Sequence, residues 1–256
     1  MTSPTSLELA VLGAGPAYTN RLGSTGAAYL VRGDGVAILL DLGQGSFPRL
    51  TTVIEPSRLD AVVISHLHPD HFIDLVPLRH YLAYQFRPPR RVRVFGPSGL
   101  ADRIDALHAR SGFTAESLDV TDLGTEPRPI GSLMLESRLV AHTDESYAVR
   151  IGGSSGPGLV YSGDVGVADD LAPLIRPGDA LLVEVSFGAG PIPPGALHLD
   201  APSIAGLVQR TRPGRVLLTH LQMGFDPDAA ISIVAAATDA PVSLVGPGDT
   251  IAIAGT

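Results

Sequence analysis

A short apolar run that leads directly into a cluster of histidine and aspartate is the feature that most constrains this chain. Residues 61–64 (Ala-Val-Val-Ile) are continuously apolar and mostly β-branched, which is typical of a strand buried on both faces. Ser65 then leads into His66-Leu67-His68-Pro69-Asp70-His71, a segment with four side chains of metal-ligand type in six residues. The pattern predicts a metal site at the carboxyl end of a buried strand.

The spacing within this segment predicts how the side chains divide. His66 and His68 are two residues apart, so in an extended backbone their imidazoles point to the same side and can converge on one ion. Pro69 favours that backbone because it disfavours the helical region for His68. Asp70 and His71 face elsewhere, in a turn that can offer them to a second ion. A polar loop with chance histidines is the alternative, and the ligand types and spacing argue against it. After the turn, a helix is expected from the spacing of Leu75, Leu78 and Leu82.

The segment His66-Leu67-His68-Pro69-Asp70-His71 resembles the H-x-H-x-D-H signature of the metallo-β-lactamase superfamily. Three more ligand candidates each follow an apolar run, namely His142, Asp164 and His220. The resemblance implies two sets that share one carboxylate. The first ion would be bound by His66, His68 and His142, the second by Asp70, His71 and His220, and Asp164 would bridge them.

The resemblance also implies the cofactor and the fold. Two divalent cations would share a hydroxide that acts as the nucleophile, and a histidine-rich set suits zinc best, with manganese or iron as alternatives. The superfamily carboxylate usually stands in Gly-Asp-Thr, whereas this chain has Gly163-Asp164-Val165, so a hydroxyl near the ligand is lost. The implied fold is an αββα sandwich, in which two mixed β-sheets are flanked by helices.

Composition adds limits to this interpretation. At 256 residues and 45% hydrophobic content, the chain can form one domain over residues 1–256. The absence of cysteine means that a metal must be held by histidine and carboxylate alone. A net charge of −8 disfavours long nucleic acids as partners. No apolar stretch is long enough to span a bilayer and no signal peptide is recognisable, so we expect no membrane partner and a cytoplasmic location. Because relatives in the superfamily form homodimers, we also expect a homodimer here.

The apolar patterns predict two groups of strands, with helices following in each group. A hairpin is expected around Gly33-Asp34-Gly35, and a substrate-rim loop, rather than a dinucleotide fingerprint, is expected between Gly13 and Gly26. Strands are expected at residues 7–12, 27–32, 36–40, 61–64, 92–95, 133–140, 147–151, 159–162, 180–185 and 216–219. Helices are expected at residues 99–109, 168–175, 201–210 and 227–237.

Two further residues narrow the function. Glu184 and His198 resemble the glutamate–histidine pair of the ribonuclease Z branch, in which the histidine protonates the leaving oxygen of a phosphodiester and the glutamate orients it. With Asp70 they form the expected catalytic set. The segment from His142 to Tyr147 also resembles that branch and lacks the Pro-Gly-His-Thr of glyoxalase II and lactonase relatives.

Ribonuclease Z itself fits less well, because its bacterial forms grip tRNA with an arm inserted between the segments equivalent to His142 and Asp164. Only a short loop at residues 151–158 is available here. The resemblance is greater to the armless cyclic-nucleotide phosphodiesterases of the superfamily. We therefore expect a hydrolase of a small phosphodiester, with a cyclic nucleotide as the preferred candidate. A ribonuclease Z-like endonuclease, an ester, thioester or lactone hydrolase, and a non-catalytic binding module are the alternatives.

Several polar residues keep two interpretations each. Asp41 follows a strand and is either a turn residue or the aspartate that orients a ligand imidazole. Asp74 is either a second residue of that kind or a charge at a helix N-terminus. His80 and His108 are expected to be ordinary surface or core histidines. The basic cluster Arg87, Arg90, Arg91 and Arg93 is expected to be a solvated loop rather than a phosphate or RNA contact.

Overall fold

The computed structural model describes residues 6–153 and 155–253 and has two seven-stranded sheets packed face to face. The first sheet has the order β14-β1-β2-β3-β4-β5-β6, with β1 Leu7–Gly13, β2 Ala28–Gly33, β3 Val36–Leu40, β4 Ala61–Val63, β5 Val92–Gly96, β6 Leu118–Asp122 and β14 Thr250–Ile253. The second has the order β13-β12-β11-β10-β9-β8-β7, with β7 Arg128–Ile130, β8 Leu133–Leu139, β9 Tyr147–Gly152, β10 Leu159–Tyr161, β11 Ala180–Glu184, β12 Arg215–Thr219 and β13 Val242–Leu244.

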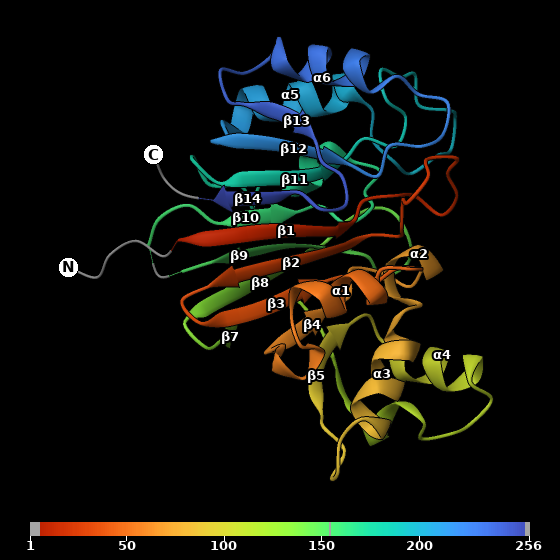
Figure 1. Cartoon of the computed structure of the whole chain (residues 1–256). Helices are drawn as coiled ribbons and strands as arrows, with labels where there is room; N and C mark the ends of the chain where they lie inside the picture. Colours follow the sequence, from red (N-terminus) through yellow and green to blue (C-terminus); the bar gives the residue numbers. More distant parts are fainter. Residues whose placement is uncertain (1–5, 154, 254–256) are drawn as a thin grey trace.

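Helices cover the outer face of each sheet (Figure 1). The first sheet is covered by α1 Phe47–Val53, α3 Leu75–Tyr84 and α4 Leu100–Leu107, and the short α2 Pro69–Phe72 lies at its edge. The second is covered by α5 Ala201–Thr211 and α6 Pro227–Ala235. Short 3₁₀ helices occur at Pro56–Arg58, Thr114–Glu116 and Ala168–Leu171. The expected αββα sandwich is confirmed.

Burial on both faces explains why so many strands are continuously apolar. Along β1, Leu7, Leu9 and Val11 point into the layer between the sheets, whereas Ala10 and Leu12 face the layer under the helices. Alternation sends successive side chains to opposite faces, so both sets must be apolar when both faces are covered.

Strand direction brings several strand ends to one edge of the sandwich. Strands β3 to β6 are mutually parallel, as are β10 to β13, so their carboxyl ends gather there. Three polar contacts join the sheets at this edge. The Tyr29 hydroxyl lies 2.6 Å from the Thr219 hydroxyl, Tyr161 donates to Asp41 at 2.6 Å, and the Tyr147 amide donates to the Ser65 carbonyl at 2.9 Å. These contacts fix the position of one sheet relative to the other at the edge where a site could form.

The hairpin at Gly33-Asp34-Gly35 is present, with positive φ angles at Asp34 (48°) and Gly35 (78°) as a two-residue type I′ turn requires. The helix predicted at residues 168–175 was wrong beyond its first turn. It ends as a 3₁₀ helix at Leu171, because Pro173 lacks an amide hydrogen and cannot occupy a helix interior. Leu174 and Ile175 are nevertheless buried in the layer under α5.

In residues 6–153 and 155–253, no helix combines the length and the apolar character needed to cross a membrane.

Candidate metal centre

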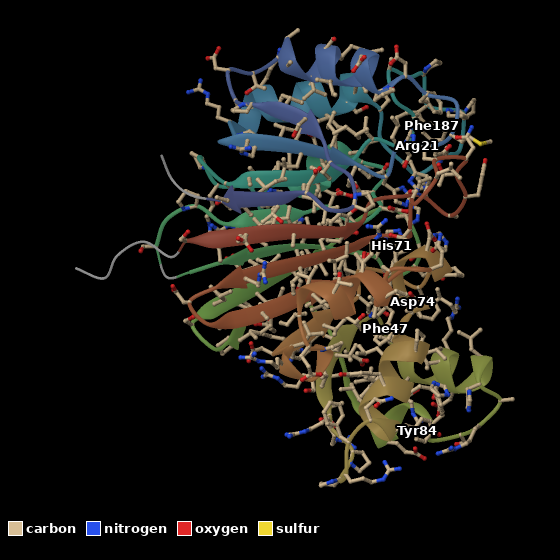
Figure 2. The ribbon with its side chains drawn as sticks, viewed as in Figure 1. Arg21, Phe47, His71, Asp74, Tyr84 and Phe187 are labelled. Carbon is tan, nitrogen blue, oxygen red and sulfur yellow. The ribbon has the colours of Figure 1, made fainter. Side chains whose placement is uncertain are left out.

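Each candidate ligand lies just beyond a strand end at the shared edge, which explains how residues distant in sequence meet (Figure 2, where His71 marks the position). His66 and His68 follow β4, and α2 begins immediately, so Asp70 and His71 turn back over the same edge. The second sheet supplies the other three. His142 follows β8, Asp164 follows β10 and His220 follows β12. The structure thus brings together all seven ligand candidates predicted from the sequence.

The first set gathers three imidazole nitrogens and one carboxylate oxygen. His68 Nδ1 lies 3.1 Å from His66 Nε2 and 3.1 Å from His142 Nε2. Asp164 Oδ2 lies 3.7 Å from the Nε2 atoms of both His66 and His142. His68 is exposed and His66 is buried, so this set opens toward solvent at His68.

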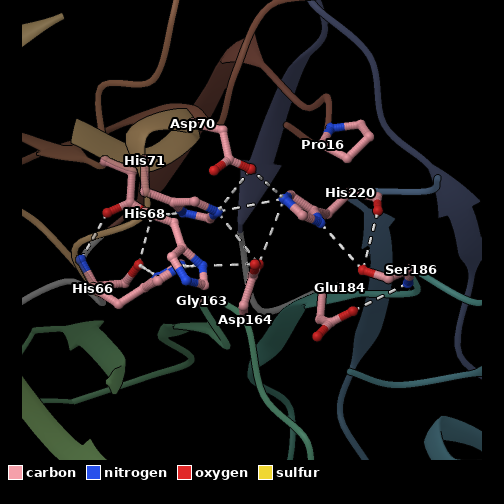
Figure 3. A network of polar contacts seen from close by, with 12 residues as sticks. Pro16, His66, His68, Asp70, His71, Gly163, Asp164, Glu184, Ser186 and His220 are labelled. Carbon is pink, nitrogen blue, oxygen red and sulfur yellow. Dashed lines mark hydrogen bonds and ion pairs between the residues drawn. The ribbon is translucent and has the colours of Figure 1, made fainter. Parts of the chain in front are cut away.

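The second set is buried and contains two imidazole nitrogens and two carboxylate oxygens (Figure 3). His71 Nε2 and His220 Nε2 are 3.3 Å apart, and Asp70 Oδ2 lies 3.3 Å from His220 Nε2 and 3.7 Å from His71 Nε2. The other oxygen of Asp164, Oδ1, lies 3.4 Å from His71 Nε2 and 3.6 Å from His220 Nε2. Asp164 therefore places one oxygen in each set, as a bridging carboxylate must.

These separations fit metal coordination. Four ligand atoms about 2.05 Å from a tetrahedral zinc ion stand about 3.3 Å from one another, and the separations given above run from 3.1 to 3.7 Å. Asp164 Oδ1 is buried and has no hydrogen-bond partner among the described residues. A buried carboxylate oxygen left in this state is costly unless a cation satisfies it. The residues present therefore fit two divalent ions.

Asp41 and Ser65 fix the orientation of one imidazole in each set. Asp41 is fully buried, and its Oδ2 accepts hydrogen bonds from His71 Nδ1 at 2.7 Å and from the Ser65 hydroxyl at 2.8 Å. The Ser65 oxygen in turn lies 3.1 Å from His66 Nδ1. Because the Nδ1 atoms of His66 and His71 carry the protons in these contacts, their Nε2 atoms are free to bind metal. Of the two interpretations of Asp41, the structure supports the orienting one.

Two other imidazoles are oriented by the second sheet. His142 Nδ1 donates to the Leu197 carbonyl at 2.7 Å, and His220 Nδ1 lies 3.2 Å from the Ser186 hydroxyl. Both contacts turn Nε2 toward the site. Neither Ser65 nor Ser186 was predicted from the sequence to orient a ligand. Ser65 directly precedes the ligand motif and Ser186 lies two residues after Glu184, which is the signal that could have found them.

Burial and charge set the protonation of these groups. Burial and the neighbouring His71 hold the pKa of His66 well below its ordinary value, and burial and His142 lower the pKa of His68. Burial also lowers the pKa of His142. These imidazoles are therefore neutral at pH 7, which is the form that binds metal. Burial opposes ionisation of Asp164, but His220 and His71 hold its pKa well below the ordinary range, so it is a carboxylate.

Two residues at strand ends have left-handed backbones. Asp41, directly after β3, has φ 56°, and His220, directly after β12, has φ 58°. Non-glycine residues adopt this region at a cost and do so mainly where the surroundings demand it. Here the turn aims each side chain back over the sheet edge instead of along the strand.

A buried glutamate holds His198 beside the metal candidates. His198 Nδ1 donates to Glu184 Oε1 at 2.9 Å, and its ring lies 4.7 Å from the ring of His142. Glu184 is itself fixed, because its two oxygens accept from the amides of Val165 and Ser186, each at 3.0 Å. Burial disfavours the imidazolium, but Glu184 outweighs it and raises the pKa of His198. Nε2 is left as the nitrogen that can exchange a proton with a ligand.

The remaining candidates lie outside this group. The Asp74 carboxylate accepts from the Phe47 amide at 2.9 Å, so it caps the N-terminus of α1 and orients no imidazole. His80 and His108 pack on Phe113, with ring centroids 5.1 and 3.7 Å from it. In the basic cluster, Arg91 pairs with Asp119, as expected for an ordinary loop.

The loop between Gly13 and Gly26 lies beside the site and opens no helix. Its Ala14 carbonyl accepts from the His220 amide at 3.1 Å, and Arg21 donates to the Leu221 carbonyl at 3.0 Å. This position agrees with the expected substrate-rim loop. A dinucleotide fingerprint would need a helix to begin in this loop, and none does.

Comparison with known proteins places the chain in a family. A family model described as a β-lactamase superfamily domain matches residues 38–221, which include all seven ligand candidates. The chain belongs to this superfamily. It is 35% identical over 239 residues to the uncharacterised protein ML1173 of Mycobacterium leprae, a match that covers 90% of this chain and 83% of that one.

Solved structures agree with the fold. The metallo-β-lactamase fold protein YhfI of Bacillus subtilis superposes with a TM-score of 0.85 at 20% identity, over 96% of this chain and 99% of that one. The short form of human tRNase Z superposes with a TM-score of 0.74 at 20% identity, over 96% and 99% of the two chains. YhfI is described as a probable metallo-hydrolase and is also a sequence relative, at 24% identity over 76% of this chain. The superfamily match and the ligand cluster together make the chain a metal-dependent hydrolase.

Proposed function

We propose that this protein hydrolyses a small phosphodiester, with a cyclic nucleotide as the preferred substrate, and that it uses two divalent ions, with zinc as the preferred metal. The observation that carries the proposal is the Glu184–His198 pair, with its 2.9 Å hydrogen bond, next to the ligand cluster. An imidazole that is held by a buried carboxylate and is not needed to complete either ligand set is suited to proton transfer.

The choice of a phosphodiester follows from the proton that His198 can supply. An alkoxide is a poor leaving group and needs a proton as its bond to phosphorus breaks, and a general acid meets that need. Two ions bound by the seven ligand candidates would supply Lewis acidity and an activated water. Asp70 would contribute as a ligand on the side of His71 and His220. His198 would donate its Nε2 proton to the leaving oxygen, and Glu184 would stabilise the imidazolium beforehand.

A ribonuclease Z-like activity is the second candidate, and the likeness to human tRNase Z favours it. Against it, strand β9 ends at Gly152 and β10 begins at Leu159, so the connection is too short for an arm that grips tRNA. The net charge of −8 also opposes a long polyanion. We therefore prefer a small substrate.

The experiment compares two leaving groups in the variant His198→Ala. Loss of a general acid should slow an alkyl phosphodiester by about a hundredfold or more. Hydrolysis of bis(4-nitrophenyl) phosphate should be slowed little, because nitrophenolate leaves readily as an anion. Both rates are measured with metal content checked by elemental analysis, and His108→Ala serves as a histidine substitution remote from the site.

Two results would overturn the proposal. Equal rate losses on the two diesters would mean that His198 serves only the folded structure. A wild-type protein that cleaves thioesters or lactones but no phosphodiester would instead establish the ester hydrolase alternative.

A further inference from the structure

A pocket of about 320 Å³ opens beside the exposed half of the ligand cluster. Its wall includes the ligand candidate His68, so a group bound there would lie next to a phosphate group held at the ligand cluster. The other lining residues come from the turn after β4, the turn after β5, the start of α4 and the segment after His142, and they are Leu67, Pro97, Ser98, Arg103, Thr143, Asp144 and Glu145.

Three charged side chains line this pocket, and one of them is fully engaged. The Glu145 carboxylate accepts from both the amide and the hydroxyl of Ser98 and, at 2.6 Å, from the Tyr147 hydroxyl. It therefore joins the turn after β5 to the segment after His142. This role is structural, and it gives the pocket a fixed wall.

Asp144 and Arg103 are the other two, and both have capacity left for a ligand. In the described part of the chain, Asp144 is exposed and no group donates a hydrogen bond to its carboxylate. Arg103 donates from Nη1 to the Leu67 carbonyl at 3.1 Å, which holds its guanidinium over the metal-ligand turn. The two side chains line one pocket without forming an ion pair with each other. A ligand can therefore meet a free acceptor on one side and free donors on the other.

We propose that this pocket binds the sugar of a ribonucleotide substrate, with the Asp144 carboxylate accepting a hydrogen bond from the 2′-hydroxyl. The proposal rests on the proposed phosphodiesterase function and specifies its substrate class. Carboxylates recognise ribose hydroxyls in this way in other nucleotide sites. In a 3′,5′-cyclic nucleotide the 2′-hydroxyl is the one sugar hydroxyl that is not esterified.

Charge favours a neutral group over a second phosphate. The lining residues include two carboxylates, Asp144 and Glu145, and one guanidinium, Arg103. An anionic group entering the pocket would lose hydration and meet more carboxylates than cationic side chains among these residues. A sugar has no charge and offers a hydroxyl donor. The same argument disfavours a polynucleotide, whose next phosphate would enter this space.

The position of His198 is consistent with this placement. The His142 ring is close to both of the other rings, with its centroid 4.9 Å from that of His68 and 4.7 Å from that of His198. A sugar whose 3′ or 5′ oxygen faces His198 can therefore extend past His142 into the pocket. Arg103 also borders a second, apolar hollow of about 310 Å³, which offers apolar surface next to the pocket for a nucleobase.

The experiment is a double-mutant cycle between the protein and the substrate, performed on metal-loaded enzyme. The substrates are adenosine and uridine 3′,5′-cyclic phosphate and their 2′-deoxy counterparts, and the variant is Asp144→Ala. Removing the 2′-hydroxyl should lower kcat/KM of the wild type about tenfold, the value expected for one hydrogen bond to a charged acceptor. In Asp144→Ala, removing the 2′-hydroxyl should lower kcat/KM by less than about threefold.

Two controls separate a direct contact from an indirect effect. Asp102→Ala removes an exposed carboxylate that is next to Arg103 but does not line the pocket. In this variant, removing the 2′-hydroxyl should lower kcat/KM as much as it does in the wild type. Arg103→Gln removes a lining cation and should weaken the ribose and deoxyribose substrates by equal factors. Turnover of bis(4-nitrophenyl) phosphate, which has no sugar, reports on the hydrolytic site itself.

The outcomes distinguish the two levels of the proposal. If the wild type cleaves the nitrophenyl diester but treats ribose and deoxyribose substrates alike, the sugar subsite is wrong and the phosphodiesterase proposal stands. The role of Asp144 would likewise be refuted if removing the 2′-hydroxyl lowered kcat/KM of Asp144→Ala as much as that of the wild type. Failure of the metal-loaded wild type to cleave any of these diesters would overturn both.

Discussion

Replacing Asp41 by asparagine should remove one metal ion selectively, and the structure shows why. Oδ2 of Asp41 accepts from His71 Nδ1 at 2.7 Å, from the Tyr161 hydroxyl at 2.6 Å and from the Ser65 hydroxyl at 2.8 Å, while Oδ1 accepts from the Ser65 amide at 2.7 Å. Asparagine can still adopt the left-handed backbone at this position (φ 56°), so the substitution tests the hydrogen bonds and not the turn.

The orientation of the new carboxamide depends on which of its neighbours can only donate a hydrogen bond and which can also accept one. The Ser65 amide can only donate, so the carboxamide oxygen must take the place of Oδ1 and the NH₂ group that of Oδ2. The hydroxyls of Ser65 and Tyr161 can rotate to accept. His71 can accept only by moving its proton to Nε2, which faces Asp70 and His220. His66 keeps its tautomer because the Ser65 oxygen can still accept from it.

The expected result is a loss of about 10- to 100-fold in affinity for the ion at Asp70, His71 and His220. The ion at His66, His68 and His142 should be retained. Elemental analysis after dialysis against graded chelator concentrations measures both ions. Asp74→Asn is the matched control, because it alters a carboxylate that caps α1 and contacts no imidazole. If Asp41→Asn held both ions with affinities within about threefold of the wild type, Asp41 would not be the residue that orients His71 for metal binding.

Three more results are expected. Asp164→Ala should release both ions, since each set uses one of its oxygens, and a variant that keeps full metal content would show that Asp164 is not the bridge. Cleavage of pre-tRNA should be negligible beside cleavage of cyclic diesters, and efficient, salt-sensitive cleavage at the 3′ end would contradict this. Gly43→Ala should destabilise the fold by roughly 2 kcal/mol or more, because the new Cβ would lie 1.8 Å from the Asp70 carbonyl oxygen. Gly246→Ala, with nothing within 4 Å, should be nearly neutral in the same thermal-unfolding measurement.

The interior strands of both sheets could be predicted from the sequence, whereas the edge strands could not. The strands that were not predicted are β6, β7, β13 and β14, and they are the four edge strands of the two sheets. An edge strand pairs on one side only and is partly exposed, so its sequence mixes polar and apolar residues over a short length. Interior strands such as β3 are buried throughout and appear as unbroken apolar runs. Helix α1 was also missed.

The candidate site was more predictable than the edges, because ligands need particular side chains directly after particular strands. What the sequence could not decide was the set of contacts that depend on three-dimensional packing. Asp41 and Asp74 both had two interpretations, and only the meeting of β3, β4 and β10 at one edge shows that Asp41 reaches an imidazole. Asp74 instead reaches the start of α1, a helix that was not predicted. The homodimer, the cytoplasmic location and the expectation of neither a long nucleic acid nor a membrane as partner stay predictions.

Each ligand set draws equally on both sheets, and this ties metal binding to the packing of the sandwich. His66 and His68 come from the first sheet and meet His142 and Asp164 from the second. Asp70 and His71, again from the first sheet, meet His220 and the same Asp164. Two ions bound in this way would hold the sheets together at this one edge.

Removing the metals should therefore loosen one edge of the sandwich and not the other. A ligand present at a thousand times its dissociation constant stabilises the folded state by about 4 kcal/mol, so chelation should lower the thermal midpoint markedly. Hydrogen exchange should rise where β3, β4, β10 and β12 end, because these turns carry Asp41 and the ligands, and change little where the same strands begin. Equal increases at both edges would mean that the ions stabilise the fold globally, and that the sheet interface does not depend on their bridging position.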